Sequence, residues 1–80
     1  MDTFESAKQF FFQGLEFFEK EMFSEAEDRF EKALRLVPDR VSTLTNLSAT
    51  KLKLRKFAEA KSLALSAIAA DKRNSEAYLV

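Results

Sequence analysis

The sequence predicts an all-α protein built of antiparallel helix pairs, and three features of the chain support this fold class. Glycine and proline each occur once among 80 residues, whereas residues of high helix propensity are abundant. Apolar residues recur at the spacing of amphipathic helices. The chain also overlays itself after a shift of 34 residues, a period typical of helical repeat architectures. The overlaid pairs are Phe23 with Phe57, Glu25 with Glu59, Ala26 with Ala60, Ala33 with Ala67, and Leu34 with Ile68.

The first helix is predicted to begin after Asp2 and to end near Lys20, because Asp2 and Glu5 have the spacing of a capping pair. Its inward stripe consists of Phe10, Gly14 and Phe17. Only Ala or Gly lets two helix axes approach to about 8 Å. We therefore expect Gly14 to touch the next helix, at a cost of about 1 kcal/mol in helix propensity.

The second helix is predicted from Ser24 to about Leu36, after a short turn. Ser24 and Glu27 have the spacing of a capping box, and the Val37–Pro38 step ends the helix because the residue before proline avoids the helical region. The expected inner face comprises Ala26, Phe30, Ala33 and Leu34.

Two further helices are predicted in the second half. Asp39 is expected to cap a third helix ending near Leu54, and Phe57 to begin a fourth ending near Ala70. Residues 71–74 are expected to break the fourth helix, with Asn74 capping the start of a fifth. The apolar positions are Val41, Leu44, Leu47 and either Leu52 or Leu54 in the third helix, and Ala60, Leu63, Ala64, Ala67 and Ile68 in the fourth.

Composition limits the chemistry that one small domain of this size can carry. The chain has no Cys and no His, which excludes disulfides and thiolate sites and removes the commonest metal ligand and general base. The polar N-terminus does not resemble a signal peptide, and no run of 18 apolar residues occurs. We expect a cytoplasmic protein with no membrane contact, no metal and no cofactor.

The net charge is zero but unevenly distributed. Residues 1–40 hold ten acidic and six basic residues, whereas residues 41–80 hold three acidic and seven basic residues. One interpretation is that each half has a local excess of one sign of charge on solvated helix faces. The other is attraction between copies arranged head to tail, or acidic and basic contacts at opposite ends.

These repeated positions resemble the tetratricopeptide repeat family, whose 34-residue unit carries aromatic, Leu-Gly, aromatic, Ala, aromatic, Ala and Pro positions at set offsets. The first unit, residues 7–40, matches at Phe10, Gly14, Phe17, Ala26, Phe30, Ala33 and Pro38. The second unit, residues 41–74, matches at Leu44, Leu47, Ala60 and Ala67. A third unit begins at Ser75, with Tyr78 at its first aromatic position. The resemblance implies a right-handed α–α superhelix, a solenoid of one domain over residues 1–80, expected to be a fragment of a longer protein.

The departures from the family pattern also carry expectations. Gln13 replaces the usual Leu, Ser48 replaces Gly, Lys51 and Ala64 replace the aromatics of Phe17 and Phe30, and Lys72 replaces Pro38. Because those two aromatics meet between paired helices in the family, their joint loss predicts repacking around Leu52 and Leu63. Glu21 and Arg55 stand where the family has turn glycines, so both turns are expected to be strained or to follow a different path.

Neither catalysis nor nucleic-acid binding is expected. The acid pairs Glu27–Asp28 and Glu19–Glu21 lie on helices, without the His or Cys partners of a catalytic constellation. A basic run near Phe57 resembles a phosphate-binding surface. However, Phe57 matches a core position and Glu59 interrupts the run, which consists of Lys51, Lys53, Arg55, Lys56 and Lys61.

A second apolar stripe on the first helix is the strongest candidate for recognition. Phe4, Phe11, Leu15 and Phe18 lie about 100° around the helix from the core stripe. In the family, the first helices of successive units line a concave groove that holds a partner peptide. The matching positions here are Phe11, Phe12, Leu15, Phe18, Thr45, Asn46 and Ala49. The stripe either packs within the protein, captures a peptide, or mediates self-association.

We therefore expect a non-catalytic protein-interaction module that binds an apolar peptide or helix in this Phe-lined groove. The alternative is a structural segment that self-associates, for example as a homodimer covering Leu63, Ala67 and Ile68, within a larger protein and in front of a catalytic domain. The resemblance does not extend to the carboxylate clamp of chaperone-binding members. Of its five positions only Asn46 matches, and the others hold Phe11, Leu15, Glu76 and Val80.

Overall fold

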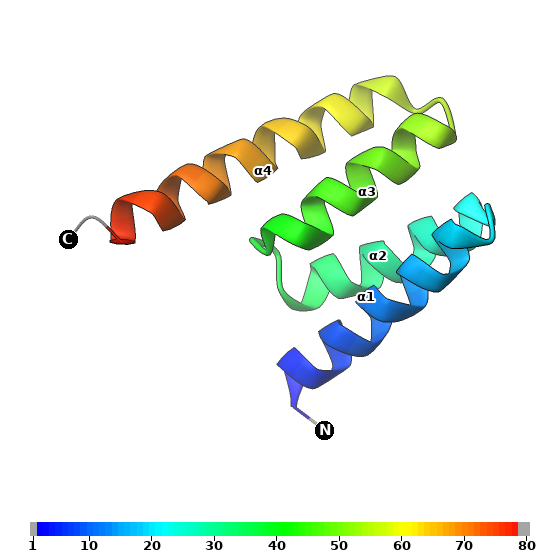
Figure 1. Cartoon of the computed structure of the whole chain (residues 1–80), viewed down its shortest axis with the longest axis horizontal. Coiled ribbons are helices and arrows are strands. Elements are labelled where there is room, and N and C mark those ends of the chain that lie inside the picture. Colours follow the sequence, from blue (N-terminus) through cyan, green and yellow to red (C-terminus); the bar gives the residue numbers. More distant parts are fainter. Residues whose placement is uncertain (1, 79–80) are drawn as a thin grey trace.

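The computed structural model describes the backbone of residues 2–78 and the side chains of residues 2–73. It contains four helices, α1 (Thr3–Glu19), α2 (Phe23–Leu36), α3 (Val41–Lys53) and α4 (Phe57–Tyr78), shown in Figure 1. No strand occurs within residues 2–78. The all-α prediction is confirmed.

The helices form two hairpins that lie side by side. α1 packs along α2, α3 packs along α4, and α2 joins the hairpins by packing against α3, whereas α1 touches α3 only slightly. The resulting slab measures 41 × 33 × 18 Å, so it is thin enough for every helix to keep a solvent-facing side. The end of α4 projects past α3 (Figure 1).

The 34-residue repeat seen in the sequence is present in the backbone. Glu21 and Arg55 both adopt positive φ, 59° and 62°. The turns close with equivalent hydrogen bonds, Met22 N–H to the Phe17 carbonyl at 2.9 Å and Lys56 N–H to the Lys51 carbonyl at 2.8 Å. Non-glycine residues in this left-handed region are strained by about 1 to 2 kcal/mol. The prediction of strained turns is therefore confirmed.

Gly14 lies where α1 crosses α2. A Cβ at this position would lie 2.6 Å from Cε1 of Phe30, closer than any real Cβ contact, and Phe30 is fully buried. The expected role of Gly14 as a contact residue is confirmed. The Phe30 ring occupies the space that a side chain at position 14 would need.

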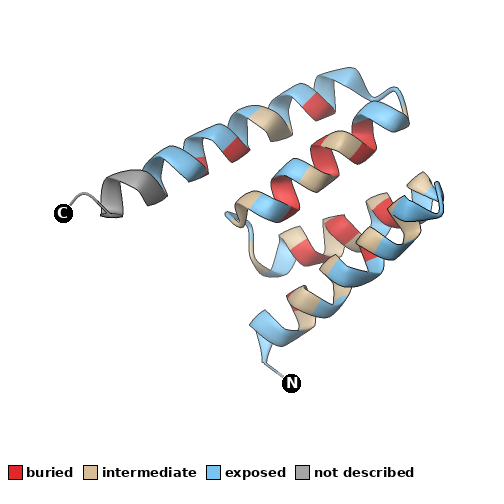
Figure 2. Cartoon of the chain, viewed as in Figure 1, coloured by how far each residue is buried: buried red, intermediate tan, exposed pale blue. Residues whose placement is uncertain are grey.

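Two buried clusters form the core. One contains Ala26, Phe30 and Leu47, and the other contains Leu44, Ala67 and Ala70. In Figure 2 the buried positions follow the inner sides of the helices. Of the predicted repeat positions, Gly14, Ala26, Phe30, Ala33, Leu44, Ala60 and Ala67 are buried, Phe10 and Phe17 are half-buried, and Pro38 is exposed.

The helix starts agree only partly with the predicted caps. Glu5 N–H donates to Oδ1 of Asp2 at 2.8 Å, as expected. The Ser24 cap is wrong, because the closed turn lets α2 begin at Phe23, with Met22 at the cap position and no side-chain cap. The Asp39 cap is also wrong, since Arg40 occupies that position in α3. Asp39 instead pairs with Arg73 at 3.5 Å.

Two other expectations fail in the second hairpin. α4 continues through residues 71–74 to Tyr78 without a break, because this segment contains no Gly or Pro to end it. The side chains of Asn74, Glu76, Tyr78 and Val80 lie outside the described residues. Leu52 is exposed, so the predicted repacking does not involve it, whereas Leu63 packs against both core clusters.

Candidate functional site

The predicted groove residues on α1 divide into two groups. Phe11, Leu15 and Phe18 are half-buried and pack against the cluster of Ala26, Phe30 and Leu47. Phe12 differs because 56% of it is exposed, and Phe4 is exposed as well. Each side chain of the first group contacts the core and is also partly exposed to solvent. Phe12 and Phe4 contribute aromatic surface that the core leaves uncovered.

Aromatic contacts connect this surface to the interior. The Phe11 ring lies 5.7 Å from the buried Phe30 ring and 5.9 Å from the exposed Phe12 ring, centroid to centroid. The Phe18 ring packs edge-on against Phe23 at 5.2 Å. Such edge-to-face geometry fixes ring orientation. The exposed aromatic surface is therefore held by packed rings beneath it.

The predicted groove residues on α3 are more polar than those on α1. Thr45 is exposed, and Asn46 and Ala49 are half-buried. Nδ2 of Asn46 donates to the Ser42 carbonyl at 2.8 Å, and Oγ1 of Thr50 donates to the Asn46 carbonyl at 2.8 Å. The Asn46 side chain is thus partly engaged by its own helix. Its free amide oxygen and the Thr45 hydroxyl remain as polar groups on the α3 side.

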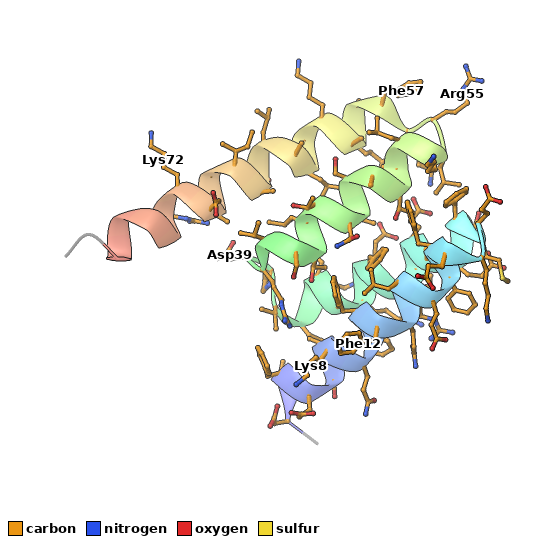
Figure 3. All side chains as sticks on the ribbon, in the orientation of Figure 1. Lys8, Phe12, Asp39, Arg55, Phe57 and Lys72 are labelled. Atoms are coloured by element: carbon orange, nitrogen blue, oxygen red, sulfur yellow. The ribbon has the colours of Figure 1, made fainter. Side chains whose placement is uncertain are left out.

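Cations surround the aromatic rings of this region. The Arg40 guanidinium lies 5.2 Å from the Phe4 ring centroid and 5.7 Å from that of Phe11. The Lys8 ammonium lies 5.9 Å from the Phe4 centroid, and Lys53 is at the same distance from Phe23. Lys8 and Phe12 lie along the same helix, α1, as labelled in Figure 3. Cation–π contacts of this kind orient exposed rings with modest energy.

Sequence reasoning missed a buried ion cluster on the other face. It placed Lys51 in a basic run near Phe57, but only 4% of the Lys51 side chain is exposed. Its ammonium donates to Glu27 at 2.6 Å, Glu59 at 2.9 Å and Glu31 at 3.3 Å. Lys56 also donates to Glu27, at 2.8 Å. The 34-residue register already puts Lys51 at the position of Phe17, but its partners Glu27 and Glu31 are too distant in the chain for that register to identify them.

The cluster controls the charge state of its members. Burial by itself raises the pKa of Glu27, but hydrogen bonds from Lys51 and Lys56 outweigh it, so the pKa of Glu27 lies below its usual range. Burial likewise lowers the pKa of Lys51, but hydrogen bonds to Glu27, Glu59 and Glu31 outweigh it and raise that pKa above its usual range. Both groups are therefore charged at neutral pH, which is how a buried lysine remains stable.

A cleft of about 600 Å³ lies beside the ion cluster, where α2, α3 and α4 meet. Three Leu side chains give it an apolar wall, and charged groups surround them. Among these charged groups, Lys51 is paired with Glu31 and Glu59. The lining residues are Glu31, Leu34, Arg35, Pro38, Leu47, Lys51, Glu59, Ser62 and Leu63.

Two further kinds of site were sought in the described part of the chain. Within it, no set of three or more His, Cys, Asp or Glu side chains is arranged to hold a metal ion. No helix there combines the length and the apolar character needed to cross a membrane. Comparisons of the chain with models of known protein families, with curated proteins and with solved structures found no match.

Proposed function

We propose that this chain is a tetratricopeptide-like, non-catalytic interaction module, and that the face shared by α1 and α3 holds an apolar peptide or helix. The observation that carries the proposal is the exposed aromatic surface of Phe12 and Phe4. The Phe12 ring contacts that of the half-buried Phe11, and an exposed apolar patch of this kind usually marks an interaction site.

The energetics of such a site are adequate for weak binding. Full burial of a Phe side chain contributes roughly 1.5 to 3 kcal/mol. Covering the exposed parts of Phe4 and Phe12 together with the rims of three half-buried residues gives several such contributions. After the cost of association, we expect dissociation constants in the micromolar range or weaker. Thr45 and Asn46 would orient the bound backbone rather than supply affinity.

The two repeat units support the family assignment within this proposal. Both turns have the same backbone conformation, and both hairpins place small residues at the same helix contacts, Ala26 and Ala33 in one and Ala60 and Ala67 in the other. In a solenoid of such units the first helices of each pair share one face. We expect the exposed aromatic residues of α1 to lie on that face.

A titration with pooled apolar peptides, followed by backbone amide NMR shifts, tests the proposal. We expect shifts at Thr45, Asn46 and Ala49, and a Phe12→Ser variant is expected to weaken binding at least tenfold. Phe57→Ser is the matched control, because Phe57 is 57% exposed but begins α4, apart from Phe12 in Figure 3. Equal losses in both variants, or shifts confined to α4, would contradict the groove.

Light scattering over a concentration series distinguishes self-association through the same face from peptide binding, because it measures whether the chain is a monomer or a dimer. A monomer at all concentrations leaves the aromatic surface available to a peptide. A dimer that Phe12→Ser dissociates, and that excludes the peptides, would assign the face to assembly instead.

A further inference from the structure

The outward side of α4 is a second open surface, and it is apolar at its centre. Leu65 and Ile68 are 58% and 64% exposed. Lys61 and Lys72 lie on the same side of the helix at helical spacing, and both are exposed. Figure 3 shows Lys72 projecting from α4 away from α3, and in Figure 2 this side of the helix is largely exposed. Among the described helices, only α3 packs against α4, and this apolar centre between two cations lies outside that contact.

The protein contains its own example of how this side of the helix is covered. A shift of 34 residues places Lys61, Leu65 and Ile68 on Glu27, Glu31 and Leu34 of α2. On α2 that side packs against α3. Leu34 is half-buried against the clusters that contain Leu44 and Leu47. Glu27 and Glu31 bind the Lys51 ammonium at 2.6 and 3.3 Å. A helix placed like α3 would therefore cover α4 in the same way.

The opposite end of the molecule does not provide that helix. On α3, the buried residues include Thr43, Leu47 and Thr50, which are at most 1% exposed. Their counterparts on α1 are Gln9, Gln13 and Glu16, and all three are polar and exposed. The outer side of α1 thus resembles the polar end of a repeat array, which water satisfies. Stacking of α1 from a second copy onto α4 would bury these polar groups.

The charges on α4 specify the missing helix. On α2, Glu27 pairs with a lysine of α3. The equivalent residue on α4 is Lys61, and Lys72 adds a second cation nearer the C-terminal end of α4. We propose that α4 binds an acidic amphipathic helix of a partner protein. This helix carries two apolar residues three positions apart, which pack on Leu65 and Ile68. A carboxylate four positions after the second apolar residue then pairs with Lys61.

This site is independent of the α1–α3 face, since it uses a different helix and a different side of the molecule. It is tested with two helix-stapled peptides based on residues 41–54, which carry the required apolar spacing at Leu44 and Leu47. One peptide keeps Lys51 and the other carries Lys51→Glu. Binding to the intact chain is followed by amide shifts in α4.

The acidic peptide is expected to bind the wild-type chain about fivefold more tightly than the lysine peptide. Lys61→Glu in the chain is expected to reverse that preference. Ile68→Ser is expected to weaken the acidic peptide at least tenfold. Because Lys61 and Ile68 are exposed, circular dichroism should show that both variants remain folded. Phe12→Ser is expected to leave this binding unchanged.

Three results would overturn the proposal. The first is that the acidic peptide does not bind the wild-type chain. The second is that the Lys61→Glu chain still prefers the acidic peptide. The third is that the acidic peptide binds the Ile68→Ser chain as tightly as the wild-type chain. A concentration-dependent dimer that Ile68→Ser dissociates would also overturn it, since a second copy would then cover α4.

Discussion

The two hairpins of this protein have equivalent turns but fill their interiors differently. In the first, Gly14 leaves room for the buried ring of Phe30. In the second, the counterparts are Ser48 and Ala64, and the Ser48 hydroxyl donates to the Ala60 carbonyl at 2.8 Å instead of making room for a ring. A glycine–aromatic contact in one hairpin is thus replaced by a buried hydrogen bond beside a small side chain in the other.

The same contrast appears between Phe17 and Lys51. Phe17 is half-buried, with the Arg29 guanidinium 5.8 Å from its ring centroid. Lys51, at the same place in the second hairpin, is buried among Glu27, Glu31 and Glu59. The repeat therefore constrains the turns and the small contact residues. A space-filling position accepts either an aromatic ring or a cation, provided that the cation is paired.

Lys51→Ala is expected to be the most damaging change to this arrangement. It removes a buried cation that Glu27, Glu31 and Glu59 share, and it leaves Glu27 with Lys56 as its cation partner. We expect the free energy of unfolding to fall by about 3 kcal/mol, measured by urea denaturation. For a domain of this size that is a large share of the total stability.

Lys53→Ala serves as the control for Lys51→Ala, because Lys53 is exposed on the same helix. Its effect is expected to stay within about 0.5 kcal/mol. Equal effects for the two lysines would mean that the ion cluster contributes nothing to stability. Lys51→Met should recover part of the loss through packing, but it removes the lysine partner of Glu31 and Glu59 and leaves Glu27 with Lys56.

Gly14→Ala is expected to reduce the free energy of unfolding by about 2 kcal/mol. The new Cβ would lie 2.6 Å from Cε1 of Phe30, which has no free space to move into. Overpacking of this kind outweighs the gain of about 1 kcal/mol in helix propensity. The same denaturation experiment on Phe30→Leu with Gly14→Ala should show partial recovery. A stabilising Gly14→Ala would show that the two helices are not in close contact here.

The pH dependence of stability reports on Glu27. Because its folded pKa is lowered from the ordinary value of 4.5, Glu27 contributes stability that is present above that value and is lost as the pH falls through the folded pKa. Lys51 remains protonated throughout this range. Glu27→Gln is expected to cost about 1 kcal/mol at pH 7, and to flatten the decline in stability at acid pH.

Thermal unfolding between pH 7 and pH 3 measures this dependence. Glu25→Gln, which changes an exposed carboxylate on the same helix, is the control and should leave the decline intact. An unchanged decline in Glu27→Gln would show that other carboxylates dominate the acid response.

The regular parts of this fold were predictable from the sequence because they depend on local chemistry. Helical periodicity, the Asp2 cap and the contact role of Gly14 follow from short-range patterns. The aromatic face of α1 was predictable as a candidate site for the same reason. Its apolar residues exceed the number that one helix contact can bury. The strained turns at Glu21 and Arg55 were expected because the repeat family that the sequence resembles has glycine at these positions.

The parts that were not predictable depend on contacts between distant residues. Lys51 meets Glu27 and Glu31 across 24 and 20 positions, so its sequence neighbours suggest only a basic run. The continuation of α4 through residues 71–74 depends on weak helix propensities that a single sequence does not resolve. Which edges of Phe11 and Phe18 remain open depends on how the core rings pack.

The turns provide the smallest expected effects and a direct test of the shared backbone. Glu21→Gly and Arg55→Gly each relieve a residue held at positive φ, and each also increases the entropy of the unfolded chain. We expect a net stabilisation of about 0.5 kcal/mol for each. Glu21→Ala and Arg55→Ala retain the strain and should show no gain. Because the turns share the same dihedral angles and hydrogen bonds, the two glycine variants should agree, and their combination should be additive. A gain at one turn and a loss at the other would show that the side chains, rather than the backbone, distinguish the hairpins even at their ends.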